Sequence, residues 1–128
     1  MGWAVLFADA FAQDYEAMPE DAQDALVATL RILREFGPAA SRPHVDTLSD
    51  SDYPNMKELR FHTATGEWRA AFAFDLRRQA IVLVCGSKSG ESKKVFYKWL
   101  IDTADKRYTA YLEWLKQEEA RKKAQTKK

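Results

Sequence analysis

Two arginines and one lysine are spaced along the middle of the chain so that they can meet at a single anion. Arg60 and Arg69 lie in neighbouring segments separated by a short turn, and Lys88 lies between glycines after a third segment. A guanidinium binds a phosphate through two parallel hydrogen bonds, and opposed residues on adjacent antiparallel strands stand about 5 Å apart. The two arginines can therefore flank one phosphate if they share a face. That depends on the register across the turn at residues 64–66, which the sequence leaves open.

The elements that must carry these cations are three short runs of aromatic and β-branched residues separated by turn-rich tetrapeptides. The pattern predicts a meander of three antiparallel strands, at 56–63, 67–75 and 80–88. Because side chains alternate along a strand, the bulky apolar residues of the first two strands share one face. The opposite face carries Arg69 followed by two small alanines, which suits a surface that something approaches closely. The third strand is apolar on both faces, so we expect it to be central or well covered.

Further elements flank this meander. Residues 3–7 form a short β run that we expect to pair with the meander as a fourth strand. Helical spacing and stop signals predict two helices, at 10–18 and 19–36, which form a hairpin over the apolar face. Residues 38–55 are a long connection, and loops of this length are usually functional or mobile. A long amphipathic helix follows at 91–115.

Length and composition indicate one domain, residues 1–115, followed by a charged tail, residues 116–128, that we expect either to fray or to tether nucleic acid. The formal net charge is only +1, so bulk charge does not indicate a polyanionic partner. Cys85 lies in an apolar run, and we interpret it as a buried apolar residue. His44 and His62 show no repeated ligand spacing, so we expect no metal and no cofactor.

The sequence contains no stretch with the pattern of a secretory signal and no apolar run that approaches the ~20 residues of a membrane span. We therefore expect a cytoplasmic protein that makes no use of a membrane.

Three stretches carry a resemblance to a known protein family. They are Lys-Glu-Leu-Arg-Phe-His at 57–62, Gly-Glu-Trp-Arg-Ala-Ala-Phe-Ala-Phe-Asp at 66–75, and Gly-Ser-Lys-Ser-Gly at 86–90 with Lys-Val-Phe-Tyr at 94–97. Together they resemble the RelE/ParE superfamily of toxins, in particular the phage-derived HigB-like branch of bacterial type II toxin-antitoxin systems. The resemblance implies an α+β, RelE-like fold of the microbial RNase type with the order β-α-α-β-β-β-α. In that fold an antiparallel sheet is covered by an N-terminal helical hairpin and a long C-terminal helix.

The resemblance also implies a function. It points to a ribosome-dependent endoribonuclease that cleaves mRNA, inhibits translation and is held in check by an antitoxin, often a helix-turn-helix protein. We expect that antitoxin either to cover the cationic face or to dock on the first two helices. Two alternatives stay open: a ParE-like toxin that inhibits DNA gyrase by protein contacts on the same scaffold, and a phage-derived accessory protein whose toxicity has decayed.

Cleavage of RNA by its own 2′-OH needs a base, cations around the phosphate and an acid for the leaving 5′-oxygen. Carried over residue by residue, the resemblance assigns this chemistry to Arg60, Arg69, Lys88 and Tyr97, and the arginines would replace a metal. Tyr97 can stack on a base, or transfer protons if neighbouring cations lower its pKa. His62, on the strand face of Arg60, is the other proton-transfer candidate, and the identity of the general base stays open. Each of these residues can alternatively be an ordinary surface or core residue.

Other cations are expected to bind RNA outside the catalytic group. They are Lys57, Lys93 and Lys94.

Overall fold

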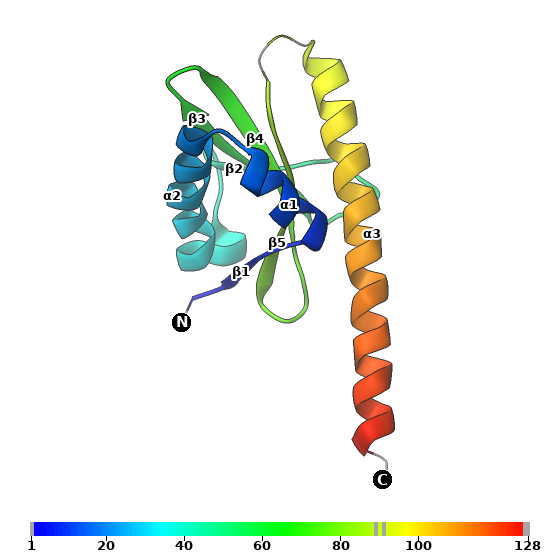
Figure 1. Ribbon diagram of the computed structural model, residues 1–128. Helices are drawn as coiled ribbons and strands as arrows, with labels where there is room; N and C mark the ends of the chain where they lie inside the picture. Colours follow the sequence, from blue (N-terminus) through cyan, green and yellow to red (C-terminus); the bar gives the residue numbers. More distant parts are fainter. Residues whose placement is uncertain (1, 89, 91, 127–128) are drawn as a thin grey trace.

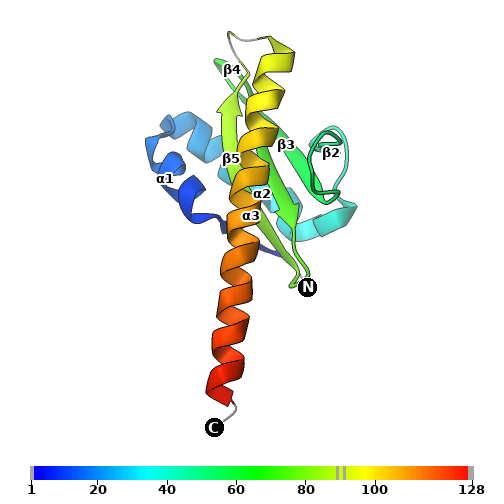
Figure 2. The ribbon, with the colours of Figure 1, turned by 90° about the vertical axis from the view of Figure 1, so that its right-hand side faces the viewer.

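The computed structural model describes residues 2–88, 90 and 92–126. Its elements are, in chain order, β1 (Ala4–Phe7), α1 (Asp9–Ala17), α2 (Glu20–Phe36), the short 3-10 helix η1 (Gly37–Ala39), β2 (Val45–Thr47), β3 (Met56–Thr63), β4 (Gly66–Phe74), β5 (Gln79–Ser87) and α3 (Lys93–Thr126). The strands form one five-stranded sheet in the order β1-β5-β4-β3-β2. Helices α1 and α2 lie on one face of the sheet and α3 lies on the other, as Figures 1 and 2 show. The predicted α+β fold class is confirmed.

The predicted meander is present, and the N-terminal run joins it as a strand. Strands β3, β4 and β5 pair in antiparallel fashion, whereas β1 pairs parallel to β5, with Ala4 opposite Gln79. The sheet is therefore mixed, not wholly antiparallel. A parallel pair cannot be joined by a tight hairpin, and here the two helices and three other strands intervene between the partners.

The connection between α2 and β3 contains more structure than we expected. Its strand β2 pairs in antiparallel fashion with β3, and Val45 stands opposite Leu59. Val45 is buried in the core under α2, which gives this strand its apolar anchor. A strand of three residues is too short to show an alternating pattern, so the sequence does not reveal it.

A register shift between β4 and β5 decides which face the end of β5 presents. Ala71 pairs with Val84, whereas the next residue of β4 pairs with Val82, so Leu83 is an extra residue in β5. Both Leu83 and Val84 pack into the core under α3. Such a β-bulge shifts the alternation of all later residues in the strand by one position.

The bulge places Lys88 on the face that carries Arg69. Gly86 stands opposite Arg69, and the backbone N–H of Lys88 donates to the carbonyl oxygen of Glu67 at 2.9 Å, which continues the ladder beyond β5. Without the extra residue, strict alternation would turn Lys88 towards α2. The bulge is therefore a condition for the predicted group of cations.

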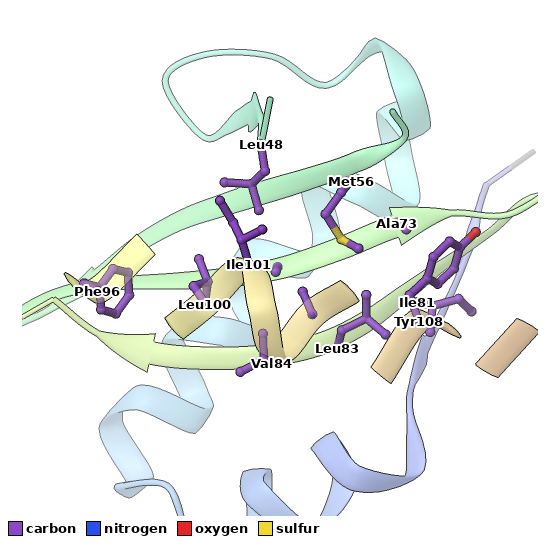
Figure 3. Close-up of a cluster of buried hydrophobic side chains, with 12 residues drawn as sticks. Leu48, Met56, Ala73, Ile81, Leu83, Val84, Phe96, Leu100, Ile101 and Tyr108 are labelled. Carbon is purple, nitrogen blue, oxygen red and sulfur yellow. The ribbon is translucent and has the colours of Figure 1, made fainter. Parts of the chain in front are cut away.

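Two apolar cores cover the two faces of the sheet. The first packs α1 and α2 against the sheet through Phe11, Leu26, Leu30 and Leu33, as predicted for the helical hairpin. The second lies under α3 (Figure 3) and consists of Leu48, Met56, Ala71, Ala73, Ile81, Leu83, Val84, Phe96, Leu100, Ile101, Ala104 and Tyr108. Since the alanines of β4 carry only methyl groups, α3 can lie close to that strand. The sequence indicated that something approaches this face of β4 closely, and in the structure the element that does so is α3.

Helix α3 is 34 residues long and continues through residues 116–126, where we expected a frayed tail. Its last turns extend beyond the sheet, and their side chains are mostly exposed (Figures 1 and 2). The last two predicted tail residues, 127–128, lie outside the described residues. Among the helices that the structure describes, none is both long enough and apolar enough to cross a membrane.

Cys85 is half-buried against the core under α1 and α2, in line with its interpretation as an apolar residue. Burial raises the pKa of its thiol to about 12, so the nucleophilic thiolate is disfavoured.

The packing of α3 predicts a large loss of stability when its core is truncated. We expect Leu100→Ala to lower the free energy of unfolding by roughly 2–5 kcal/mol, because this fully buried side chain fills the core between α3 and the sheet. Leu76→Ala is the matched control, since Leu76 is fully exposed in the turn between β4 and β5 and should change stability by less than about 0.5 kcal/mol. Urea unfolding measures both. Equal losses of stability in the two variants would contradict the described packing of α3 against the sheet.

Candidate functional site

A cleft of about 760 Å³ opens between the sheet, the first turns of α3 and the connection that contains β2. We call it the cationic cleft, and its lining residues are Arg42, Asp46, Thr47, Leu48, Ser49, Asp50, Glu58, Arg60, Arg69, Lys88, Lys93, Lys94, Tyr97 and Ile101. Six of these side chains are cationic and three are acidic, which gives the cleft a formal charge of +3 in a chain whose total is +1. The cleft is therefore one of the regions of the chain with net positive charge.

The strand register places Arg60 directly opposite Arg69. The two arginines share the α3 face of the sheet, and both line the cationic cleft. This settles the question that the turn at residues 64–66 left open. Like charges opposed across two strands repel each other, so the pair requires a counter-charge between its members.

Glu58 supplies that counter-charge from a buried position, where the residue is 4% exposed. Its Oε2 accepts a hydrogen bond from Arg60 Nη2 at 3.1 Å, and its Oε1 lies 3.5 Å from Arg69 Nε. The Tyr97 hydroxyl donates to the same Oε1 at 2.6 Å. One carboxylate thus joins β3, β4 and α3.

Arg60 also contacts a second carboxylate. Its Nη2 lies 3.2 Å from Asp46 Oδ2, and Arg42 approaches the same oxygen at 2.9 Å. Burial disfavours the charged guanidinium of Arg60, but the hydrogen bond and charge of Glu58, together with the charge of Asp46 and other contributions, raise the pKa of Arg60. The pKa of Asp46 is lowered by the backbone N–H of Thr47 and by Arg42. Arg60 therefore stays charged and is held in place by two acids.

Arg69 is more deeply buried than Arg60 and is 7% exposed. Its Nε donates to the Tyr97 hydroxyl at 3.2 Å, and its Nη1 donates to the carbonyl oxygen of Trp68 at 2.9 Å. Glu67, an exposed acid, lies 3.5 Å from the same Nη1. These contacts fix the plane of the guanidinium at the base of the cationic cleft.

Lys88 completes the predicted group. Its Nζ lies 5.7 Å from the centre of the Tyr97 ring, and within the described ranges the ammonium forms no ion pair. Burial, followed by the positive charges of Arg69 and Lys93, lowers its pKa. Lys88 is therefore a stronger proton donor than an ordinary lysine.

Lys93 and Lys94 begin α3 at the rim of the cleft, and both are exposed. The helix is capped by Ser92, whose Oγ accepts from the Val95 N–H at 3.2 Å. The N-terminus of a helix attracts anions, and acidic residues are usual there. Here the first turn contains two lysines and no acid, an arrangement that favours an external anion such as a phosphate.

Tyr97 lies where we expected a proton-transfer group, but its ionisation is shifted in the opposite direction. Burial and the hydrogen bond to Glu58 raise the pKa of Tyr97, and together they outweigh the opposing effect of Arg69. The condition that we set for proton transfer by Tyr97, a pKa lowered by neighbouring cations, is therefore not met. The phenol is held in its neutral form by the acid beneath it.

Two predicted residues lie apart from this group. His62 is exposed near the far end of β3, opposite Glu67, and does not line the cationic cleft. By alternation, the Lys57 side chain lies on the face of β3 opposite to Arg60. Its Nζ donates to Thr47 Oγ1 at 3.0 Å. The structure therefore brings together six of the eight predicted residues: Arg60, Arg69, Lys88, Lys93, Lys94 and Tyr97.

Three members of the ion-pair network in the cleft were not among our sequence-based candidates. Glu58 stands two positions before Arg60 on the same strand, so alternation alone places it on the arginine face. Arg42 and Asp46 lie in the connection before β3, and their position depends on the short strand β2. A sequence signal therefore existed for Glu58 but not for the other two.

Comparisons with known proteins identify relatives over most of the chain. The profile of the family described as phage-derived protein Gp49-like (DUF891) matches residues 13–109. HigB3 of Mycobacterium tuberculosis H37Rv, provisionally named a toxin, is 41% identical over 96 residues, which cover 75% of this chain and 82% of HigB3. HigB2 of the same organism, also provisionally named a toxin, is 38% identical over 96 residues, which cover 74% of this chain and 47% of HigB2.

Solved structures share the fold. The Escherichia coli toxin RelE, solved in the free state as an arginine-to-alanine double mutant, superposes with a TM-score of 0.55 at 13% identity, covering 84% of this chain and 98% of RelE. RelE in the archaeal RelE–RelB complex from Pyrococcus horikoshii OT3 gives a TM-score of 0.51 at 14% identity, covering 71% of this chain and all of that chain (100%). At these identities the likeness concerns the fold, and it confirms the RelE-like architecture that the sequence predicted.

The hydrogen bond between Tyr97 and Glu58 predicts a specific pH dependence of stability. A phenol whose pKa is raised in the folded state stabilises the protein fully below its unfolded pKa of 10.0, and this contribution is lost as pH rises above that value. We expect Tyr97→Phe to be less stable than the wild type near neutral pH by about 1–3 kcal/mol, because the buried carboxylate loses a partner. We also expect its stability to fall less steeply above pH 10.0. Urea unfolding at a series of pH values measures both effects, and parallel curves would contradict the described contact.

Proposed function

The chain belongs to the family of phage-derived Gp49-like proteins, and from this premise we propose that it is the toxin of a type II toxin-antitoxin module and that it cleaves messenger RNA. The observation that carries the proposal is the convergence of Arg60, Arg69 and Lys88 on one cleft that Tyr97 also lines. Arg69 donates to the Tyr97 hydroxyl, and Lys88 lies over its ring. The names of the relatives HigB3 and HigB2 support a toxin. A surface that only binds another protein, as in the gyrase alternative, has no need of buried converging cations.

The cleft favours an RNA phosphate as its ligand. Cleavage by the 2′-OH places additional negative charge on the non-bridging oxygens of the scissile phosphate. Preorganised donors in a partly dry site stabilise such charge far better than water does. Arg60 and Arg69 are preorganised in this sense, because each is held by carboxylate or carbonyl contacts before any substrate arrives. This stabilisation is of the kind that a metal ion would otherwise supply.

Lys88 is our candidate for the acid that protonates the leaving 5′-oxygen. A general acid works best when its pKa lies near the working pH, and burial and neighbouring cations move the pKa of Lys88 in that direction. The exposed lysines at the start of α3 can hold a neighbouring phosphate of the same strand. His62 and Lys57 have no place in this assignment, because neither lines the cleft.

We also propose the partners that the module requires. The substrate is mRNA on the ribosome, and the inhibitor is a cognate antitoxin with a helix-turn-helix domain, both acting in the cytoplasm. The neighbour RelE is known in complex with RelB, which supports an antitoxin for this fold. A small reading frame next to the gene that encodes a helix-turn-helix protein would support the module. Co-expression should then yield a complex that restores growth.

A cleavage assay tests the enzymatic proposal. Purified protein is added to translating ribosomes, and the 5′ ends of the transcripts are mapped. We expect new ends with the wild type and a rate about 10²–10³-fold lower with Lys88→Ala, because one charge that stabilises the transition state is removed. Lys106→Ala is the matched control, an exposed lysine of α3 that does not line the cleft. Absence of new ends with the wild type would contradict the proposal.

Salt dependence tests the proposed phosphate contacts at the start of α3. The double variant Lys93→Gln/Lys94→Gln should bind a short RNA more weakly, and its binding should depend less steeply on salt, because fewer counterions are released. The control Lys122→Gln/Lys123→Gln removes the same charge near the other end of α3. If the two double variants weaken binding equally, the C-terminal end of α3 also contacts RNA. This is the outcome that a nucleic-acid tether in the tail would give.

A further inference from the structure

We infer that Arg42 and Arg60 form a second phosphate-binding site in the cationic cleft, and that Asp46 occupies this site until RNA displaces it. The ligand is a phosphate next to the scissile one on the same RNA strand, so the site rests on the proposed function. It includes one residue, Arg42, that neither the sequence nor the comparisons assign to RNA binding. In the free protein the carboxylate of Asp46 takes the place of that phosphate.

One oxygen of Asp46 lies between two guanidiniums. Asp46 Oδ2 accepts a hydrogen bond from Arg42 Nε at 3.0 Å and lies 2.9 Å from Arg42 Nη2. The same oxygen accepts a hydrogen bond from Arg60 Nη2 at 3.2 Å. The planar fork of a guanidinium matches phosphate as well as carboxylate, so a non-bridging phosphate oxygen fits between the same two groups. The two arginines are therefore already arranged to bind a phosphate.

Asp46 is an acid that an incoming phosphate can displace. Its side chain is 26% exposed, and that of its partner Arg42 is 76% exposed. An ion pair that is open to solvent contributes little free energy. The strand register also places Asp46 directly opposite Glu58, and like charges opposed across two strands repel each other. Rotation of the Asp46 side chain out of the site therefore relieves a repulsion, whereas the buried Glu58 remains in place.

The guanidinium of Arg60 has donors to spare for a phosphate. Both of its hydrogen bonds to acids come from Nη2, and its Nη1 makes no hydrogen bond to another described residue. Its Nε is buried and has no hydrogen-bond partner within the described part of the chain. A buried donor without a partner is costly, so the contacts with Asp46 and Glu58 do not satisfy this guanidinium. A phosphate offers more acceptor oxygens than the carboxylate that it replaces, while Glu58 continues to hold Arg60.

The position of Arg42 extends the row of cations across the sheet. Arg69 on β4 stands opposite Arg60 on β3, and Arg42 precedes β2, the next strand of the sheet. Since neighbouring strands lie about 5 Å apart, the row is long enough for more than one phosphate. Arg60 lies in the middle of the row, so it can contact the scissile phosphate together with Arg69 and the next phosphate together with Arg42.

Binding of an RNA that cannot be cleaved tests whether Asp46 competes with a phosphate. The probe is a short RNA in which every 2′-hydroxyl is methylated, so the attacking group is absent. We expect Asp46→Asn to bind this RNA about two- to tenfold more tightly than the wild type at fixed salt, because the competing charge is removed while the shape of the side chain is kept.

Asp50→Asn is the matched control. It removes the same charge from the lining of the same cleft, but Asp50 forms no ion pair within the described residues. This variant should therefore tighten binding less than Asp46→Asn does. If Asp46→Asn binds no more tightly than Asp50→Asn, the proposal is overturned and Asp46 serves only to hold Arg60.

A double-mutant cycle with Arg42→Ala tests the same site independently. In the wild type this change removes a contact with Asp46 from the free protein and a contact with phosphate from the complex, so the two losses partly cancel. In the Asp46→Asn background only the phosphate contact is lost, and Arg42→Ala should weaken binding by at least about twofold more. Arg31→Ala, at an exposed position of α2 away from the cleft, should have the same small effect in both backgrounds. Equal losses from Arg42→Ala in both backgrounds would overturn the proposal.

Cleavage of transcripts on ribosomes separates this site from the proposed function. We expect Asp46→Asn to lower KM more than it changes kcat, because the phosphate that it admits is not the one that reacts. An unchanged or higher KM would overturn the second site alone. A wild type that cuts no transcript would overturn the proposed function, whereas the comparison of RNA binding would still decide whether Asp46 competes with phosphate. If Asp46→Asn does not fold, Asp46→Ala takes its place, since it also removes the carboxylate.

Discussion

The site depends on one buried carboxylate that separates two guanidiniums. The antiparallel register forces Arg60 and Arg69 to face each other across β3 and β4, and two opposed cations would spread apart or draw in solvent. Glu58 prevents this by turning one oxygen to each arginine. Burying such ions costs desolvation energy, and a buried ion pair is weak evidence for stability. The arrangement is more easily understood as a means of keeping two cations charged, close and immobile.

The rest of the fold brings two more groups to this carboxylate from distant parts of the chain. The small side chains of Ala71 and Ala73 allow α3 to lie close to β4, and the core around Leu100 fixes the helix there. This packing positions Tyr97, which lies three residues before Leu100, so that its hydroxyl contacts Glu58. The bulge at Leu83 turns the end of β5 so that Lys88 reaches the same place. Four separate elements thus supply the site, and each is positioned by packing that lies outside it.

Patterns of alternation and helical spacing were sufficient to predict the meander, the helical hairpin and α3, because each buries a long apolar stripe that the sequence displays. Alternation also indicated which residues share a strand face with each arginine, but the register that sets Arg60 opposite Arg69 came from the structure. The bulge was not predictable, since the run from Ala80 to Cys85 is apolar on both faces and hides a shift of one residue. Strand β2 was too short to leave a pattern. The direction of the Tyr97 pKa stayed open in the sequence because it depends on Glu58, a contact across 39 residues that spacing cannot reveal.

The distribution of charge bears on how such a cleft would select RNA. The cleft carries a formal +3 while the whole chain carries +1, so the other residues sum to −2, because acids elsewhere outweigh the basic residues 116–128. Long-range attraction to nucleic acid is therefore weak, and binding depends on a close fit at the cleft. Tyr97 is the one aromatic residue among the lining side chains within the described part of the chain, and its hydroxyl is already engaged. Contacts then fall mainly on phosphates, which position a strand but do not specify its sequence. On the proposed function, selectivity would have to come largely from whatever presents the RNA to the cleft, which is a physical reason for such an enzyme to act on the ribosome.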